Sequence, residues 1–173
     1  MRQHLSAVSR RLLLAIPSVA VLTSCGPSRP AFTYDVLPAA PPPTKIERLL
    51  LWLPPANYVL DDKRVAASFA AALAPYGVAL ETGNTKPMEL ERSDDQKPVI
   101  QRFNPTHRLE IDIAEMTASS MGRFSGATVV LGGVLYRRDS KVPLVRFTYD
   151  LRSREAPDLA AKVVERLRAA GYL

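Results

Sequence analysis

The sequence has few of the residues that most often carry chemistry or cross-link a fold. Its 173 residues include one cysteine, Cys25, two histidines and one tryptophan. A single cysteine excludes an intrachain disulfide, so the folded part must be stabilised by packing. The apolar run Leu12–Leu22 covers only 11 residues and contains Pro17 and Ser18, whereas a membrane-spanning helix needs ~20. Internal repeats and heptads are also absent, which excludes solenoids and coiled coils.

The charge is moderate and mixed in sign. Lys and Arg number 23 against 17 Asp and Glu, which gives a formal net charge of +6. The basic residues are spread among acids and form no stripe, so the sequence predicts no nucleic-acid partner. Weak attraction to an anionic head group or to an acidic partner stays open.

The N-terminal residues have the three parts of an export signal. Arg10 and Arg11 close a basic start, Leu12–Leu22 is a short apolar region, and Thr23 and Ser24 are small residues at its end. This order is typical of a signal that is cleaved during export. Cleavage after Ser24 removes three arginines and no acid, which lowers the formal charge from +6 to +3.

Because this signal ends on Leu22-Thr23-Ser24-Cys25, it resembles the signal of a bacterial lipoprotein. The resemblance implies a lipid on the Cys25 thiol and a further acyl chain on its new amine, and two such chains hold a protein stably at a membrane. Gly26 follows the cysteine instead of Asp. In a host with two membranes, this implies the inner leaflet of the outer membrane, with the domain facing the periplasm. The alternative is an ordinary secretory signal beside a free cysteine.

The composition predicts three parts: a lipoprotein signal peptide at residues 1–24, a lipidated Cys25 with a proline-rich tether at residues 25–44, and one α+β periplasmic domain at residues 45–173. The prolines of the tether favour extended backbone, which would reach up to roughly 60 Å. Within the tether, Phe32, Tyr34 and Val36 alternate like a strand. This piece either docks on the domain or a partner, or serves as a spacer.

The domain begins with a β-α-β pattern. Ile46–Leu53 is an unbroken apolar run, which indicates a central strand covered on both faces. Asp61 and Asp62 offer a helix start, and a helix ends at Pro75 and Gly77. Val78–Thr82 is a second short strand. The buried face of the helix is predicted to consist of Val65, Phe69, Leu73 and Tyr76.

The second half of the domain reads as antiparallel strands and a final helix. The polar segment Gly83–Asn104 is predicted to be a long connection. Its apolar residues Val99, Ile100 and Phe103 either form a short strand or hold the connection against the domain. Alternating strands start at His107, at Ala127 with a bulge or close packing at Gly132-Gly133, and near Val145. A helix from about Glu155 buries Leu159, Val163, Leu167 and Ala170. The sum predicts an α+β fold: a mixed β-sheet with two helices packed on one face.

The chemical inventory predicts no enzyme, no metal site and no cofactor beyond the covalent lipid on Cys25. His107 would be the only histidine after cleavage, and a strand-end position explains it without catalysis. A triad from Ser119 or Ser125 with His107 and Asp112 lacks the Gly-x-Ser-x-Gly frame of a nucleophile elbow. The acids Glu89, Glu91, Asp94 and Asp95 lack the register of a calcium loop.

Two polar segments are candidate contacts with a partner: the connection Gly83–Asn104 and the predicted hairpin tip Arg137–Lys141. The candidate contact residues are Lys86, Asp94, Asp95, Lys97, Arg137, Arg138 and Lys141.

In layout, with its lipoprotein signal, proline-rich tether and small β-α-β-plus-hairpin domain, the chain resembles the auxiliary lipoproteins of ABC-type lipid transport systems. The layout also resembles, less closely, that of outer-membrane assembly lipoproteins and of lipoproteins with a domain like the N-terminal domain of TolB. The resemblance implies a non-catalytic accessory or adaptor that binds another envelope protein, in lipid transport or outer-membrane assembly. A direct lipid or glycolipid carrier is the alternative, and an enzyme ranks last.

Overall fold

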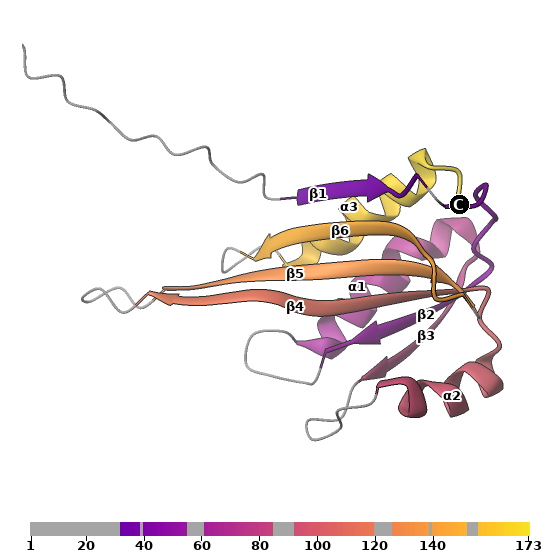
Figure 1. Ribbon diagram of the computed structural model, residues 1–173, viewed down its shortest axis with the longest axis horizontal. Coiled ribbons are helices and arrows are strands. Elements are labelled where there is room, and N and C mark those ends of the chain that lie inside the picture. The colour runs from indigo at the N-terminus through magenta and orange to yellow at the C-terminus, as the bar shows by residue number, and fades with distance from the viewer. Residues whose placement is uncertain are drawn as a thin grey trace, which may run out of the picture.

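The computed structural model describes residues 32–38, 40–54, 61–84, 92–119, 126–138, 140–151 and 156–173. These residues form a six-stranded mixed sheet with three α-helices beside it (Figure 1). The strands lie side by side in the order β1-β6-β5-β4-β2-β3. The predicted α+β class is confirmed.

The β-α-β start is confirmed, because β2 and β3 pair in parallel around α1. Strand β4 pairs in parallel with the other side of β2, whereas β4, β5, β6 and β1 pair antiparallel. The elements in chain order are β1 (Phe32–Val36), β2 (Arg48–Leu53), α1 (Asp62–Leu73), the 3-10 turn η1 (Ala74–Tyr76), β3 (Ala79–Asn84), α2 (Arg92–Phe103), β4 (His107–Ser119), β5 (Gly126–Arg137), β6 (Pro143–Leu151) and α3 (Ala156–Ala169).

Strand β2 is buried on both faces, as its unbroken apolar run predicts. Leu49, Leu51 and Leu53 belong to the main core. Because neighbouring side chains on a strand point to opposite faces, Leu50 and Trp52 point away from that core, yet Leu50 is 0% and Trp52 3% exposed. This second face of the sheet therefore also needs a cover at β2.

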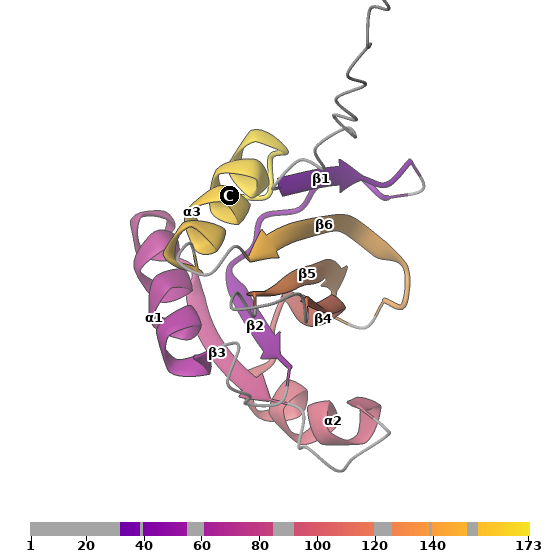
Figure 2. The same ribbon diagram turned by 90° about the vertical axis from the view of Figure 1, so that its left-hand side faces the viewer.

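Helices α1 and α3 cover the first face of the sheet (Figure 2). Asp61 caps α1 by accepting a hydrogen bond from the backbone N–H of Arg64 at 3.2 Å, which satisfies one of the N–H groups left over at a helix start. The core between the layers includes Val65, Phe69 and Leu73 from α1 and Leu159, Val163 and Leu167 from α3. Among the residues that the structure describes, no helix has both the length and the apolar composition to cross a membrane.

The prediction for Tyr76 is wrong. Its side chain is 40% exposed, because the α-helical turn ends at Leu73 and the chain continues as the tighter turn η1. The tighter winding rotates Tyr76 away from the stripe that Val65, Phe69 and Leu73 form. Gly77 then ends the helix in the left-handed conformation, with φ 67°, as predicted.

The alternation of Phe32, Tyr34 and Val36 does form a strand, β1, and this strand docks on the domain. It pairs antiparallel with β6 at one edge of the sheet. The rings of Phe32 and Phe147 pack with centroids 6.0 Å apart. The sheet thus includes part of the segment predicted as a tether, and residues 26–31 alone lie between Cys25 and β1. Covalent geometry limits that link to about 25 Å.

Helix α2 corrects the prediction that Gly83–Asn104 is a loop or a short strand. Its position over the second face of the sheet follows from two contacts: Arg102 pairs with Glu81 of β3, and Gln96 accepts a hydrogen bond from Arg108 of β4 at 2.7 Å. Glu81 and Arg108 are the two residues that flank Leu50 in the sheet. Helix α2 therefore covers β2 at Leu50 on this face. Residues 85–91 lie outside the described part.

The glycine pair in β5 marks close packing and not a bulge. Register shifts occur between Ile113 and Glu115 of β4 and next to Leu135, whereas Gly132 and Gly133 stay in register. A Cβ at Gly133 would lie 2.0 Å from the ring of Phe147. The missing side chain lets this ring lie flat on the strand, which agrees with the close packing that the sequence offered as the alternative to a bulge.

Replacing Phe69 by alanine tests the core. We expect Phe69→Ala to lower the free energy of unfolding by ~3–5 kcal/mol, because a fully buried ring leaves a cavity. The matched control is Tyr76→Ala, which removes an exposed ring seven residues later and should cost at most ~1 kcal/mol. Urea melts of both variants check this, and equal losses would contradict the placement of α1.

Candidate functional site

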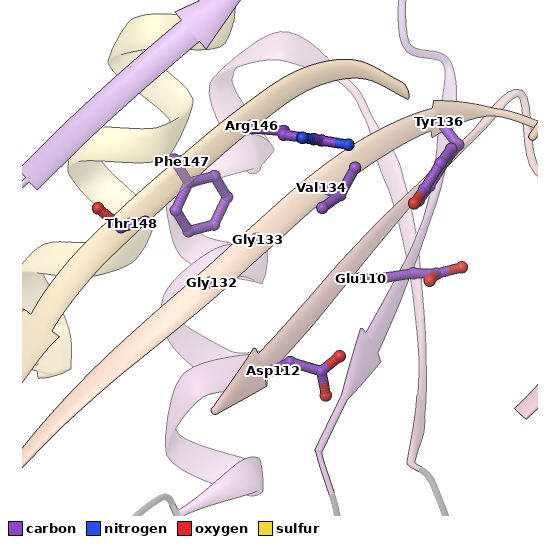
Figure 3. A pocket seen from close by; sticks show the side chains of 9 residues that line it. All are labelled: Glu110, Asp112, Gly132, Gly133, Val134, Tyr136, Arg146, Phe147 and Thr148. Atoms are coloured by element: carbon purple, nitrogen blue, oxygen red, sulfur yellow. The ribbon is translucent and has the colours of Figure 1, made fainter. Parts of the chain in front are cut away.

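The open face of the sheet beyond α2 carries polar side chains around a shallow pocket of about 340 Å³ (Figure 3). Strand alternation places them there, because their neighbours Leu109, Ile111 and Leu135 point into the core. Carboxylates from β4 face a phenol from β5 and a guanidinium from β6. The polar lining residues are Glu110, Asp112, Tyr136, Arg146 and Thr148.

Arg108 connects this face to α2 and to the turn between β5 and β6. Its Nη1 donates to Oε1 of Gln96 at 2.7 Å and to Oε1 of Glu110 at 3.0 Å, and its Nη2 donates to the carbonyl of Ser140 at 3.2 Å. The guanidinium carbon also lies 5.3 Å from the ring centre of Tyr136. With 15% of Arg108 and 19% of Glu110 exposed, the ion pair is shielded from water, so breaking it costs more than breaking a surface pair.

The environment of Tyr136 follows from the same cluster. Burial raises the pKa of Tyr136 above its ordinary value, the negative charge of Glu110 adds to the increase, and the nearby Arg108 opposes it. Tyr136 is therefore a neutral phenol at neutral pH, and its hydroxyl is available as a hydrogen-bond donor or acceptor in the pocket.

A second depression lies at the end of the sheet where β2 and β4 begin and β5 ends. It has a volume of about 350 Å³ and includes four cationic side chains and one acidic side chain, Glu47. We call it the basic pocket. Its cations come from the link before β2, from β2 itself and from the end of β5: Lys45, Arg48, Arg137 and Arg138.

Hydroxyl and amide groups hold two of these arginines in place. Arg137 Nη2 donates to Oγ1 of Thr44 at 3.2 Å. Arg138 donates from its guanidinium to the side-chain oxygen of Asn104 and from its backbone N–H to the carbonyl of Thr106 at 3.0 Å. Arg138 thereby ties the β5–β6 turn to the residue that follows α2.

His107 forms the inner wall of the basic pocket. It is 1% exposed, and its Nε2 and Nδ1 lie 3.3 Å and 3.2 Å from the hydroxyl oxygens of Thr44 and Thr106. Its ring meets that of Tyr172 edge to face at 6.1 Å. Burial, with a smaller effect of the nearby Arg137 charge, lowers the pKa of His107 from 6.5 to about 4. His107 is therefore neutral at neutral pH, and both ring nitrogens are engaged.

The triad considered from the sequence does not form between His107 and Asp112. His107 shares its face of β4 with Leu109 and Ile111, whereas Asp112 lines the pocket on the opposite face. Ser125 and the side chain of Ser119 lie outside the described part. Within the described ranges, no group of three or more His, Cys, Asp or Glu side chains is placed to hold a metal ion.

The structure joins the two candidate contact segments of the sequence. Lys97 of α2 and Lys141 of the β5–β6 turn are both exposed, and Arg108 and Arg138 connect their segments. Asp94 and Asp95 lie in the first turn of α2, but their side chains lie outside the described part. Residues that fall wholly outside it are Leu22, Thr23, Ser24, Cys25 and Lys86.

Sequence reasoning missed Lys45, Arg48 and Arg108. The alternation of Leu109 and Ile111 places Arg108 and Glu110 together on the other face of β4, so this pair could have been predicted from the sequence. The closeness of Arg48 to Thr106 depends on the parallel register that pairs Leu49 with His107, which no local pattern reports.

The sequence matches no protein-family model and no curated protein. Among solved structures, the fold is similar to that of the PelC dodecamer from Paraburkholderia phytofirmans. That match has 11% identity and a TM-score of 0.50, and it covers 82% of this chain and 99% of PelC. Lipoprotein GNA1162 from Neisseria meningitidis matches with 18% identity and a TM-score of 0.39 over 70% of this chain and 99% of its own. At these identities the likeness to PelC shows the fold.

The buried histidine makes stability depend on pH. Because the pKa of His107 is near 4 in the folded chain and near 6.5 when unfolded, the unfolded chain binds more protons between these values. Stability is therefore full above pH 6.5 and falls as the pH drops towards 4, by an amount on the order of 2 kcal/mol. Urea melts at pH 7.5 and 4.5 should show a smaller acid loss for His107→Gln than for the unchanged chain. Equal losses in both would contradict the buried neutral histidine.

Proposed function

We propose that this chain is a membrane-anchored envelope lipoprotein that serves as a non-catalytic accessory or adaptor and binds another envelope component. The anchor is Cys25, at the end of the signal pattern Leu22-Thr23-Ser24-Cys25. In a host with two membranes, the domain faces the periplasm from the inner leaflet of the outer membrane. Lipid transport and outer-membrane assembly are the processes that fit such an adaptor. The fold shared with PelC is compatible with this role.

The observation that carries the proposal is the composite surface made by α2 and the β5–β6 turn. Arg108 donates hydrogen bonds to both segments, from one side chain in the sheet between them. Arg138 adds a contact from the turn to Asn104 after α2. Two polar segments that are distant in sequence are thus fixed side by side, with Lys97 and Lys141 exposed on them. A preorganised polar surface lowers the entropy cost of binding a partner.

The state of His107 supports a role without catalysis. A general base needs a ring nitrogen within reach of a substrate proton and a pKa near the working pH. In His107, both nitrogens lie at threonine hydroxyls, and burial lowers the pKa to about 4. The histidine instead packs the start of β4 against Tyr172.

The alternative of a direct lipid carrier is less well supported. An acyl chain between helices and sheet needs unfilled space, whereas Phe69, Leu73 and Leu131 between these layers are 0% exposed and belong to one continuous core. The close packing of the alanine-rich α1 was the sequence argument against such a cavity, and the filled core strengthens it.

A second copy of this chain is a further candidate partner. The PelC chain that shares this fold is a dodecamer, so self-association is a specific alternative to a different envelope protein. The sheet has two outer strands, β1 and β3, and an outer strand can add the strand of a neighbouring chain.

The anchor is tested by Cys25→Ser. We expect this variant to leave the membrane fraction, because it lacks the thiol that carries the lipid. The matched control is Ser24→Ala, which keeps a small residue before the cysteine and should keep the protein in the membrane fraction. Fractionation followed by mass spectrometry of the N-terminal peptide checks both points. An unlipidated Cys25 in a membrane-bound protein would contradict the anchor.

The composite surface is tested by photo-crosslinking in cells. A crosslinker in place of Lys97 or Lys141 should trap one specific envelope protein, and the two positions should trap the same one because they share a surface. A crosslinker in place of Lys63, on α1 on the opposite face of the sheet, is the matched control and should not trap it. A product that contains two copies of this chain supports self-association. A product formed equally from Lys63, or none from any position, would contradict the adaptor surface.

A further inference from the structure

The lining of the basic pocket carries more positive than negative charge. Its lining holds Lys45, Arg48, Arg137 and Arg138 against the single acid Glu47. His107, which also lines it, is neutral at neutral pH because of its lowered pKa. Four cations around about 350 Å³ repel one another, and a bound anion removes that repulsion.

Arg48 shows the imbalance most clearly. Its side chain is half-buried, and within the part of the chain that the structure describes this side chain has no hydrogen bond or ion pair. Two other arginines at the same end of the sheet do have carboxylate partners, since Arg102 pairs with Glu81 and Arg108 with Glu110. A partly desolvated guanidinium with five donors and no acceptor is costly unless a ligand supplies the acceptors.

Arg137 has donors available for a ligand. Among the described residues, its guanidinium is engaged by the hydroxyl of Thr44 through one nitrogen, which leaves its other N–H groups as donors. Thr44 in turn contacts the buried ring of His107. These contacts hold Arg137 beside the pocket and lower the entropy cost of binding an anion there.

We propose that the basic pocket is a binding site for a phosphate group. Arginine forks match the geometry of phosphate oxygens and bind them through paired hydrogen bonds, whereas Lys45 adds a mobile point charge at the rim. The volume exceeds that of one phosphate, so the ligand is a pyrophosphate or a phosphate that carries a further polar group. This site lies beyond the adaptor role, because it would exist with or without a protein partner.

The phosphate has two possible sources. The N-terminal end of β1 is level with the middle of β4, because Phe32 pairs with Tyr149, Tyr149 with Leu131 and Leu131 with Ile113. The basic pocket lies where β2 and β4 begin (Figure 1), and a link of up to about 25 Å from Cys25 lets the pocket meet either the membrane or the aqueous side. The phosphate belongs to a soluble molecule or to a lipid head group.

Calorimetric titration of the full chain in nonionic detergent tests the proposal, with two probes. Sodium pyrophosphate represents a soluble phosphate, and dihexanoyl phosphatidylglycerol below its micelle concentration represents a head group. Sodium chloride at equal ionic strength is the blank. Arg48→Gln and Arg137→Gln should each weaken binding about tenfold or more. Arg48→Lys, which keeps the charge, should lose less than Arg48→Gln.

The matched control is Arg64→Gln, which removes an exposed arginine of α1 outside the pocket and should leave the affinity unchanged. Thermal melts without ligand show that each variant is folded, and Lys45→Gln, at an exposed position, replaces Arg48→Gln if the latter unfolds. On saturation, the ring resonances of His107 should shift, because this ring lines the pocket.

Binding of pyrophosphate with this variant pattern supports the site and a soluble source. Equal or tighter binding of the phosphatidylglycerol with the same pattern supports the site and a head-group source. Heats that match the chloride blank for both probes would overturn the proposal. So would binding that folded Arg48→Gln and Arg137→Gln retain in full, or that Arg64→Gln loses equally.

Discussion

The burial of β2 on both faces is the constraint on which the rest of the structure depends. Helices α1 and α3 cover only one face of the sheet, yet Leu50 and Trp52 point to the other and are almost fully buried. Exposing two large apolar side chains would cost about 1.5–3 kcal/mol each, so something has to cover them. Helix α2 lies over Leu50, because its Arg102 and Gln96 contact Glu81 and Arg108 on either side of that residue. Gly83 makes room for the Trp52 ring beside it.

The position of α2 then determines where the polar surfaces form. Because α2 contacts the sheet at Glu81 of β3 and Arg108 of β4, the face of β4, β5 and β6 beyond Arg108 stays open and carries the pocket around Tyr136. Arg108 lies at the boundary between the covered and the open part, and its second nitrogen holds the β5–β6 turn. The same few contacts thus complete the core, place the composite surface and bring Arg138 to the basic pocket.

The parts of the fold that the sequence predicts are those with strong local patterns. The apolar run at β2, the spacing of Val65, Phe69 and Leu73 in α1, and the alternation in β4 and β6 each report burial directly. Helix α2 was missed because its sequence is mostly polar and contains Pro98, which removes a helical hydrogen bond. Its contacts with the sheet, at Glu81 and Arg108, lie outside the helix in sequence, so no local pattern indicates them. Arg137, Arg138 and Lys97 were named from the sequence as candidate partner contacts, and that role stays a prediction. Arg48 could not be named, because its place beside them depends on the register of β2 on β4.

The docking of β1 changes the meaning of the N-terminal tether. With Phe32 and Tyr34 packed on the core, six residues lie between Cys25 and β1, and covalent geometry limits them to about 25 Å instead of the roughly 60 Å of a fully extended tether. If Cys25 carries the proposed anchor, this shorter link keeps the domain closer to its membrane than the tether expected from the sequence. The link joins the sheet at its edge, partway along the strands, because Phe32 is level with Tyr149, Leu131 and Ile113. The docking of β1 thus limits the distance at which the domain can meet a partner, whereas its orientation depends on the partner itself.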